Sequence, residues 1–224
     1  IYLSGTGNTK HCVEKLVNLL DDTARCIPLE TPYIINMLEN ENTIVLGYPT
    51  QFSNAPFMVR DFIRKNRCLW KDKKVFCVNT MGLFSGDGTG CTARLLKKYG
   101  AEILGGLQIK MPDSVCDSKL LKKGIEENRQ IVKNADKRIE QTAEQIKKGI
   151  YPKEGLSFIA HIKGLFGQRL WFYRKTIYYT EKLKISDFCI GCGLCSKECP
   201  MKNIKMKENR AVPGKRCTMC YRCI

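Results

Sequence analysis

The stretch CIGCGLCSKECP, residues 189–200, contains four cysteines separated by two, two and three intervening residues, and it ends in a proline. A second run, CTMCYRC at residues 217–223, repeats the two-residue spacing. The two runs hold seven of the 13 cysteines of the chain. Thiols at this spacing are typical of 4Fe–4S sites, where tight loops place three thiolates on one face of a cluster. The predicted cluster ligands are Cys189, Cys192, Cys195, Cys199, Cys217, Cys220 and Cys223.

Zinc is the alternative metal, because Cys-x-x-Cys units also bind zinc. A zinc site pairs two such units around one ion, whereas three cysteines in a row with a remote fourth are typical of a cubane cluster. The runs resemble a bacterial-type ferredoxin domain with two 4Fe–4S clusters. In that family each cluster takes three cysteines from one run and its fourth from the other.

The resemblance implies that Cys199 completes the cluster of the second run, and that the cluster of the first run lacks its fourth cysteine within this chain. The chain starts at Ile1 and ends one residue after Cys223. We therefore expect a sequence that is truncated at both ends.

The N-terminal string SGTGNT follows the apolar residues 1–3 and precedes a segment with helical periodicity. A strand, a loop of small hydroxyl residues and a helix N-terminus form a phosphate site, because backbone amides there bind an anion. An ordinary capped helix start is the alternative. No lysine follows the second glycine as in a P-loop, which argues against a nucleoside triphosphatase. The predicted phosphate ligands are Ser4, Gly5, Thr6, Gly7, Asn8 and Thr9.

Strand-like and helix-like segments alternate over residues 1–148. Strands are expected near residues 1–3, 25–29, 43–47, 74–79 and 101–110, and a long helix over 119–148 follows. Continuous apolar runs are typical of parallel strands that are covered on both faces. The order predicts an α/β fold with a doubly wound, five-stranded parallel sheet, in which ligands bind beyond the carboxyl ends of the strands.

Two more loops are candidates for the same ligand. The loop after the third strand contains Pro49, Thr50, Gln51 and Phe52, and Phe52 could form a wall for a flat ring or be a structural aromatic. Glycines in the loop after the fourth strand let the backbone approach a flat ligand, although a flexible loop is the alternative. The predicted ligand residues of that loop are Thr80, Met81, Gly82, Leu83, Phe84, Gly86 and Gly88.

These three loops resemble the FMN site of flavodoxins. With the cysteine runs, the chain is similar to the flavodoxin–ferredoxin fusion proteins of anaerobes. The resemblance implies a flavodoxin-like FMN-binding domain over residues 1–148, a connector over 149–180 and a small α+β ferredoxin-like iron–sulfur domain over 181–224. It also implies FMN and two 4Fe–4S clusters as cofactors.

The predicted connector is rich in aromatic and basic residues. We favour a segment that packs the two domains together over one that lies on a membrane surface. His161 is expected to be a packing or surface histidine rather than a ligand. The aromatic residues are Tyr151, Phe158, Phe166, Trp171, Phe172, Tyr173, Tyr178 and Tyr179.

The formal charge of +16 favours acidic partners, among which redox proteins are one class. No apolar run has the length of a membrane span, and the six scattered cysteines suit a reducing cytoplasm. We therefore predict a cytoplasmic protein with acidic redox partners, without nucleic acid, and with at most peripheral membrane contact.

The predicted function is electron transfer between 4Fe–4S clusters and FMN. An FMN-dependent oxidoreductase that acts on a small organic substrate is the alternative, and a basic nucleic-acid-binding protein with a structural cluster is the weaker one. No catalytic residue is predicted, because the sequence shows no acid–base pair or nucleophile constellation, and an electron carrier is favoured over a dedicated enzyme.

Overall fold

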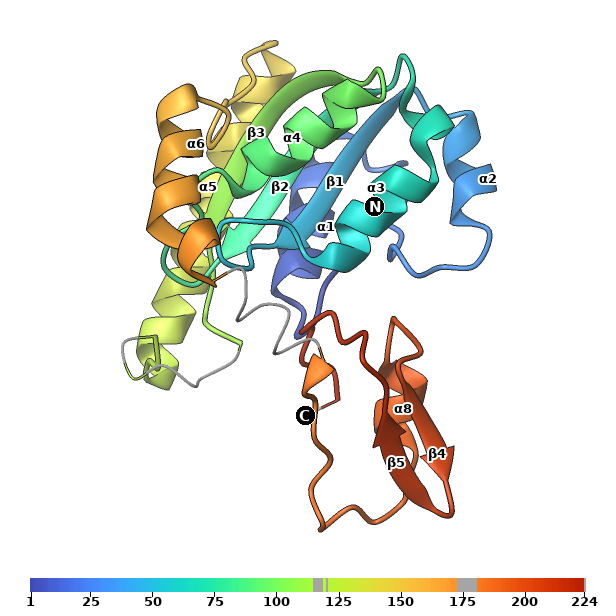
Figure 1. Ribbon diagram of the computed structural model, residues 1–224. Coiled ribbons are helices and arrows are strands. Elements are labelled where there is room, and N and C mark those ends of the chain that lie inside the picture. The colour runs from blue at the N-terminus through green and yellow to red at the C-terminus, as the bar shows by residue number, and fades with distance from the viewer. Residues whose placement is uncertain (115–118, 120, 173–180, 224) are drawn as a thin grey trace.

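The computed structural model describes residues 1–114, 119, 121–172 and 181–223 (Figure 1). Three strands form a parallel sheet in the order β1-β2-β3. Their bounds are Thr43–Pro49 for β1, Lys74–Met81 for β2 and Glu102–Lys110 for β3. These are the third, fourth and fifth strands that the sequence predicts, with β1 and β2 two residues longer than expected.

The other two predicted strands are short bridging segments. Tyr2 forms parallel bridges to Gly47 of β1 and to Pro28 on its other side. Its N–H donates to Ile27 O at 3.0 Å, and its carbonyl accepts from Leu29 N at 2.7 Å. Pro28 has no N–H group and limits the ladder at this edge. The resulting order, Pro28 segment, Tyr2 segment, β1, β2, β3, is that of a flavodoxin-like doubly wound sheet.

Helices cover both faces of this sheet (Figure 1). The helices α1 (Asn8–Leu20) and α5 (Ile125–Lys147) contribute to one buried cluster, and α3 (Phe57–Lys65) and α4 (Gly88–Lys98) contribute to the other. The short α2 (Ile34–Glu39) and the 3-10 helix η1 (Arg67–Trp70) add to the second cluster. None of the described helices has both the length and the apolar character needed to cross a membrane.

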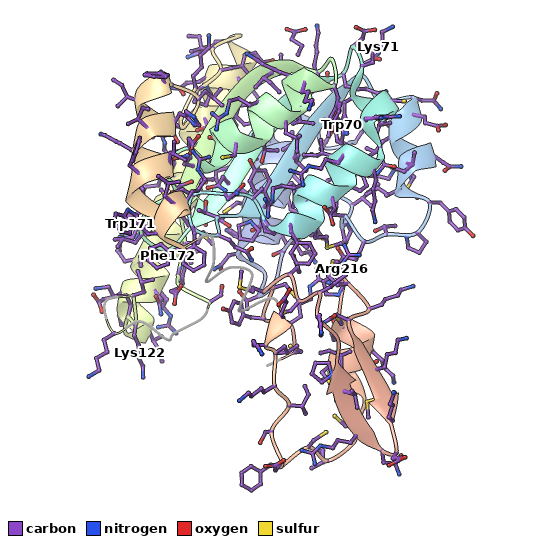
Figure 2. The ribbon with its side chains drawn as sticks, viewed as in Figure 1. Trp70, Lys71, Lys122, Trp171, Phe172 and Arg216 are labelled. Carbon is purple, nitrogen blue, oxygen red and sulfur yellow. The ribbon has the colours of Figure 1, made fainter. Side chains whose placement is uncertain are left out.

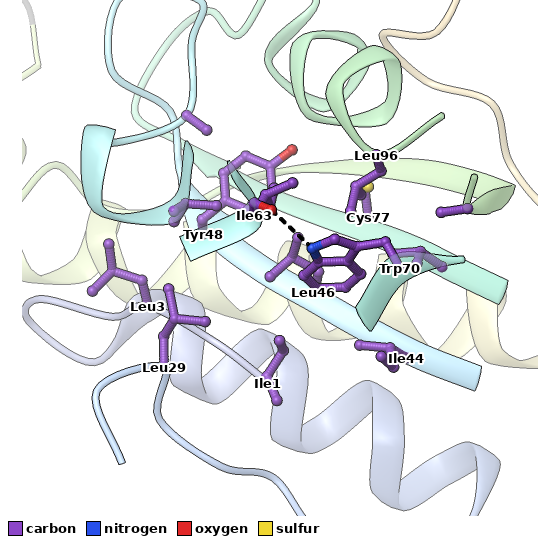
Figure 3. Packing of buried hydrophobic residues seen from close by; sticks show 14 of the residues in the cluster. Ile1, Leu3, Leu29, Ile44, Leu46, Tyr48, Ile63, Trp70, Cys77 and Leu96 are labelled. Carbon is purple, nitrogen blue, oxygen red and sulfur yellow. Dashed lines mark hydrogen bonds between the residues drawn. The ribbon is translucent and has the colours of Figure 1, made fainter. Parts of the chain in front are cut away.

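The alternation of side chains along β2 supplies both clusters. Val75 and Cys77 point to the α3 and α4 side, whereas Phe76 and Val78 point to the α1 and α5 side. Figure 3 shows the first of these clusters, in which the buried Trp70 indole N–H donates to a backbone carbonyl of α3 at 3.1 Å. The sheet is therefore packed on both faces, and this packing holds in place the loops at the carboxyl edge of the sheet.

Two single cysteines belong to these clusters. Cys12 and Cys77 are fully buried, and burial raises the pKa of each thiol to about 12. Both side chains are therefore neutral thiols at neutral pH. They are poor metal ligands in this form, because the thiolate is the form that binds metals. Their packing makes them residues of the hydrophobic core rather than additional ligands of an iron–sulfur cluster.

After α5 the chain forms α6 (Phe158–Gly164), which continues into the π-helical turn η2 (Leu165–Arg169). No helix was predicted from the sequence of this segment. The C-terminal part contains the short helix α8 (Leu194–Glu198) and an antiparallel hairpin of β4 (Ile204–Lys207) and β5 (Arg210–Pro213). Figure 1 shows this part below the sheet, and the predicted domain limits at residues 148 and 181 stay predictions.

Candidate cofactor site

The loop before α1 has the geometry of an anion site. Gly7 occupies the N-cap position with φ 103°, a left-handed conformation that suits glycine. Within the described part of the chain, no side chain caps α1 and its first turn has no acidic residue. The Ser4 hydroxyl accepts from Lys10 N at 3.2 Å and holds the loop against the helix. An anion here would meet backbone amides and the positive end of the helix dipole.

The structure brings the three predicted loops together at the carboxyl edge of the sheet. Thr9 of the first loop and Thr80 of the third share a buried hydrogen bond of 2.8 Å. Thr50 of the second loop donates its N–H to Thr80 O at 2.7 Å, and its hydroxyl lies 2.9 Å from that of Ser85. The three loops thus form one continuous surface.

A buried polar network stiffens the second and third loops. Asn79 Oδ1 accepts from the hydroxyls of Ser85, at 2.7 Å, and of Thr50. The buried Tyr48 hydroxyl donates to Gly88 O at 3.1 Å, and burial raises the pKa of Tyr48. Asn79 and Ser85 were not predicted as site residues, because their only signal is a polar residue at or just beyond the end of an apolar strand.

Two glycines around the third loop lie against the segment after α5. A Cβ on Gly86, whose φ is +56°, would lie 2.8 Å from Gly164 Cα, and one on Gly90 would lie 2.3 Å from Gly155 O. These glycines therefore make room for the connector backbone. Leu83 and Phe84 at the tip of the loop are exposed. Contact of this loop with a flavin ring stays a prediction.

Phe52, the candidate ring wall, stacks on Phe172. Their ring centroids are 4.8 Å apart and their planes differ by 10°. Figure 2 shows Phe172 next to Trp171 at the end of the helix formed by α6 and η2. The described part of the connector thus packs against the second loop, while the predicted aromatics Tyr173, Tyr178 and Tyr179 lie outside the described residues.

A fourth loop, which the sequence patterns did not connect to the site, contacts the phosphate loop. The hydroxyls of Thr6 and Ser114 lie 2.5 Å apart, and Asn8 Nδ2 donates to Pro112 O at 2.8 Å. This loop follows β3, so its position after a parallel strand was the available signal. Its remainder, including Cys116, lies outside the described residues.

The second cysteine run lies directly on two of the predicted FMN loops. A Cβ on Gly5 would lie 1.8 Å from Cys220 O, so the two backbones are in close contact. Gln51 Nε2 donates to Thr218 O at 2.8 Å and to Met219 O at 3.2 Å. These contacts join residues that are more than 160 positions apart in the sequence.

Two arginines reinforce this contact. Arg222 donates to Ser4 O at 2.8 Å and pairs with Glu30 at 2.5 Å. Arg216, labelled in Figure 2, pairs with Asp61 of α3 at 2.9 Å. The cysteine run is therefore attached to the α/β part on both sides of its central cysteine.

A cavity of about 420 Å³ opens between the phosphate loop and the C-terminal run. This volume is in the range of small-molecule pockets, which is about 300–1,000 Å³. Lys10 and Arg222 bring positive charge to the cavity, and Glu30 and Glu198 bring negative charge. The remaining lining residues are Tyr2, Ser4, Gly5, Thr6, Gly7, Pro28 and Tyr221. The uncapped helix and the small residues of this loop fit a phosphate group.

Four cysteines line one small pocket in the C-terminal part, and they are the set predicted for the second cluster: Cys199, Cys217, Cys220 and Cys223. Burial raises the pKa of the thiols of Cys217, Cys220 and Cys223. Among the described residues, no three His, Cys, Asp or Glu side chains have an arrangement that could hold a metal ion. The four cysteines nevertheless match a 4Fe–4S cluster in their number and in their donor atoms.

The first cysteine run packs against the β4–β5 hairpin. A Cβ on Gly191, whose φ is +72°, would lie 2.2 Å from Asn209 O. Backbone N–H groups of Ala211 and Gly191 hold the pKa of the Cys189 thiol below its usual value. Cys192 is exposed, and the role of this run as a set of cluster ligands stays a prediction.

Sequence comparison gives two matches. Residues 183–205 match the 4Fe-4S binding domain family (Fer4). A 24-residue stretch, 11% of this chain, is 54% identical to pyruvate synthase subunit PorD of Methanothermobacter marburgensis. The match spans 30% of the length of that curated protein.

Two solved structures are similar to the α/β part. The two-electron reduced flavodoxin of Megasphaera elsdenii is 22% identical, with a TM-score of 0.44, over 61% of this chain and 96% of that chain. The FMN-bound flavodoxin of Fusobacterium nucleatum is 19% identical, with a TM-score of 0.46, over 66% and 95%.

Proposed function

We propose that this chain, which has a flavodoxin-like strand order and a match to the 4Fe–4S binding domain family, is a flavodoxin–ferredoxin fusion that relays electrons between iron–sulfur clusters and FMN. Clusters exchange single electrons, and FMN exchanges one or two, so the pair can connect one-electron and two-electron donors. The observation that supports this relay most directly is the contact of the second cysteine run with Gly5 and Gln51.

In this proposal the FMN phosphate binds at the N-terminus of α1, within the loop from Ser4 to Thr9. The ring lies among the loops that follow β1 and β2. Cys199 and the second run hold one cluster, and the first run supplies three ligands to another. The excess of positive charge favours redox partners with acidic surfaces, because charge complementarity speeds encounter.

Replacing Thr6 with glutamate is expected to weaken FMN binding by at least about tenfold, because a carboxylate beside the dianionic phosphate costs Coulomb energy. Thr6 is exposed in the loop, so the folded protein can accommodate the longer side chain. The measurement is titration of the flavin-free full chain with FMN, followed by flavin fluorescence.

Thr43→Glu is the matched control, since Thr43 is an exposed threonine at the opposite end of β1. Wild-type affinity for FMN in Thr6→Glu would contradict a phosphate site at this loop. A matched loss in both would indicate a general effect of added negative charge.

The relay itself is tested on the full chain purified without oxygen. Iron, sulfide and flavin are quantified, and about eight iron atoms and one FMN are expected for a protein with complete ligand sets. Rapid mixing with a reduced one-electron donor protein should reduce the clusters before the flavin. Flavin reduction that is equally fast without the clusters would contradict the relay, and steady turnover of a small organic acceptor would favour the enzyme alternative.

A further inference from the structure

The helix formed by α6 and η2 turns its polar side toward the protein. His161 Nδ1 lies 2.9 Å from Asp87 Oδ2, and Arg169 pairs with the other carboxylate oxygen at 3.1 Å. Gln168 Oε1 accepts from the Ser53 hydroxyl at 2.7 Å. Asp87 is fully buried, so these contacts fix the rotation of the helix about its axis.

The opposite side of this helix is apolar and faces solvent. Its large side chains are between 37% and 76% exposed. We call this set the apolar ridge: Phe158, Ile159, Ile162, Phe166, Leu170 and Trp171. An isolated exposed apolar residue is ordinary, but a contiguous set of this kind marks an interaction surface.

The helix geometry keeps the ridge in one row. Phe158, Ile162, Phe166 and Leu170 follow each other at intervals of four residues. In a regular α-helix a step of four residues overshoots a full turn by about 40°. The π-helical turn at Leu165–Arg169 is wider and offsets this drift over the second half of the row. The row therefore runs along the outer side of the helix.

Intramolecular packing does not account for this arrangement. Gly164 lies so close to Asp87 that a Cβ would be 2.1 Å from the carboxylate, which lets the helix approach by its small and polar side. A helix that served only to stabilise the fold would bury the phenylalanines and leave the histidine and arginine in water. The ridge is instead held outward by buried polar contacts.

The chemistry around the ridge is that of an interfacial helix. Among the described residues 151–172, the basic side chains are Lys153, Lys163 and Arg169, and Arg169 is directed inward to Asp87. Lys163 is exposed beside Ile162, and Trp171 stands at the end of the row (Figure 2). Aromatic and aliphatic side chains with flanking lysines are typical of helices that lie in the headgroup region of a bilayer.

We propose that the apolar ridge binds the surface of a membrane that contains anionic phospholipids. The net charge of +16 attracts such a surface. The same charge opposes close association of two copies of this chain through their ridges. Figure 1 shows α6 along the outer side of the α/β part, and the side chains of the ridge are exposed. This inference does not depend on the proposed electron relay.

The test is co-sedimentation of the full chain with vesicles. We expect binding to phosphatidylcholine vesicles that contain phosphatidylglycerol, weaker binding at high salt, and little binding to phosphatidylcholine alone. The double variant with Phe158→Ser and Trp171→Ser should bind the anionic vesicles at least about tenfold more weakly. Each substitution removes an aromatic side chain that would otherwise bury apolar surface in the bilayer. Circular dichroism establishes that the variants keep their helices.

Tyr33→Ser is the control, because Tyr33 is an exposed aromatic residue at the start of α2, outside the ridge. Equal vesicle binding by the double variant and the control would overturn the proposal in favour of charge alone. Absence of binding to anionic vesicles would also overturn it. Self-association that depends on Phe158 and Trp171, measured by analytical ultracentrifugation without vesicles, would assign the ridge to a second copy of the chain instead.

Discussion

Replacing Cys220 with alanine is expected to remove about four iron atoms from each chain, together with the matching inorganic sulfide. Cys220 lines the same pocket as Cys199, Cys217 and Cys223, and it lies in the centre of the second run. A 4Fe–4S cluster that keeps only three protein thiolates loses iron more easily. The measurement is iron and sulfide per chain after anaerobic purification, with the visible absorbance of the clusters as a second readout.

Cys199→Ala should cause the same loss as Cys220→Ala, although Cys199 belongs to the first run in the sequence. This equality tests the sharing of ligands between the runs, because a cluster built from each run alone would respond differently. Cys68→Ser is the control, since Cys68 is exposed and outside both runs. Unchanged iron in Cys199→Ala would contradict the assignment of this residue to the second cluster.

Asp87→Ala is expected to lower the free energy of unfolding by about 3–5 kcal/mol, the range for removal of one partner from a buried ion pair. The Asp87 carboxylate is fully buried and pairs with Arg94 at 2.5 Å, His161 at 2.9 Å and Arg169 at 3.1 Å. Its removal leaves cationic groups without their counter-charge. Urea unfolding, followed by circular dichroism, measures the change.

Asp136→Ala is the matched control for Asp87. Asp136 also pairs with a histidine and a basic side chain, His11 at 2.7 Å and Lys15 at 3.7 Å, but these groups are partly exposed. Its loss should cost less than about 1 kcal/mol, as for other surface ion pairs. Limited proteolysis should cut residues 155–172 faster in Asp87→Ala than in Asp136→Ala. Equal losses of stability in the two variants would contradict a structural role of the buried carboxylate.

Local patterns were sufficient for much of the fold. The apolar runs at 43–47 and 74–79 became β1 and β2, because a strand that is covered on both faces needs no polar alternation. The string SGTGNT predicted a loop and a helix start, since small residues and a left-handed glycine permit that turn. The strand expected at residues 25–29 was shorter than predicted, and Pro28 supplies the reason.

The connector shows what such patterns leave out. Its aromatic residues predicted a segment that packs the two domains together. Its described part packs against the loops around Phe52 and Asp87 in the α/β part, and its contact with the C-terminal part stays a prediction. However, the helix formed by α6 and η2 carries Phe158 and Phe166 outward, whereas His161 and Arg169 point inward to Asp87. Periodicity alone cannot distinguish the two orientations, because the choice depends on a buried carboxylate 74 positions away in the sequence.

By itself, the sequence was enough to identify the residues that are predicted to bind cofactors. Thiol spacing and small residues before a helix are local properties, so residues 189–200 and 217–223 and the loop at residues 4–9 could be identified without a structure. Only the tertiary structure decided that the second cysteine run lies on Gly5 and Gln51, and that the apolar ridge faces outward. Both depend on contacts between residues far apart in the chain, which form only when the folded sheet brings its loops to one edge.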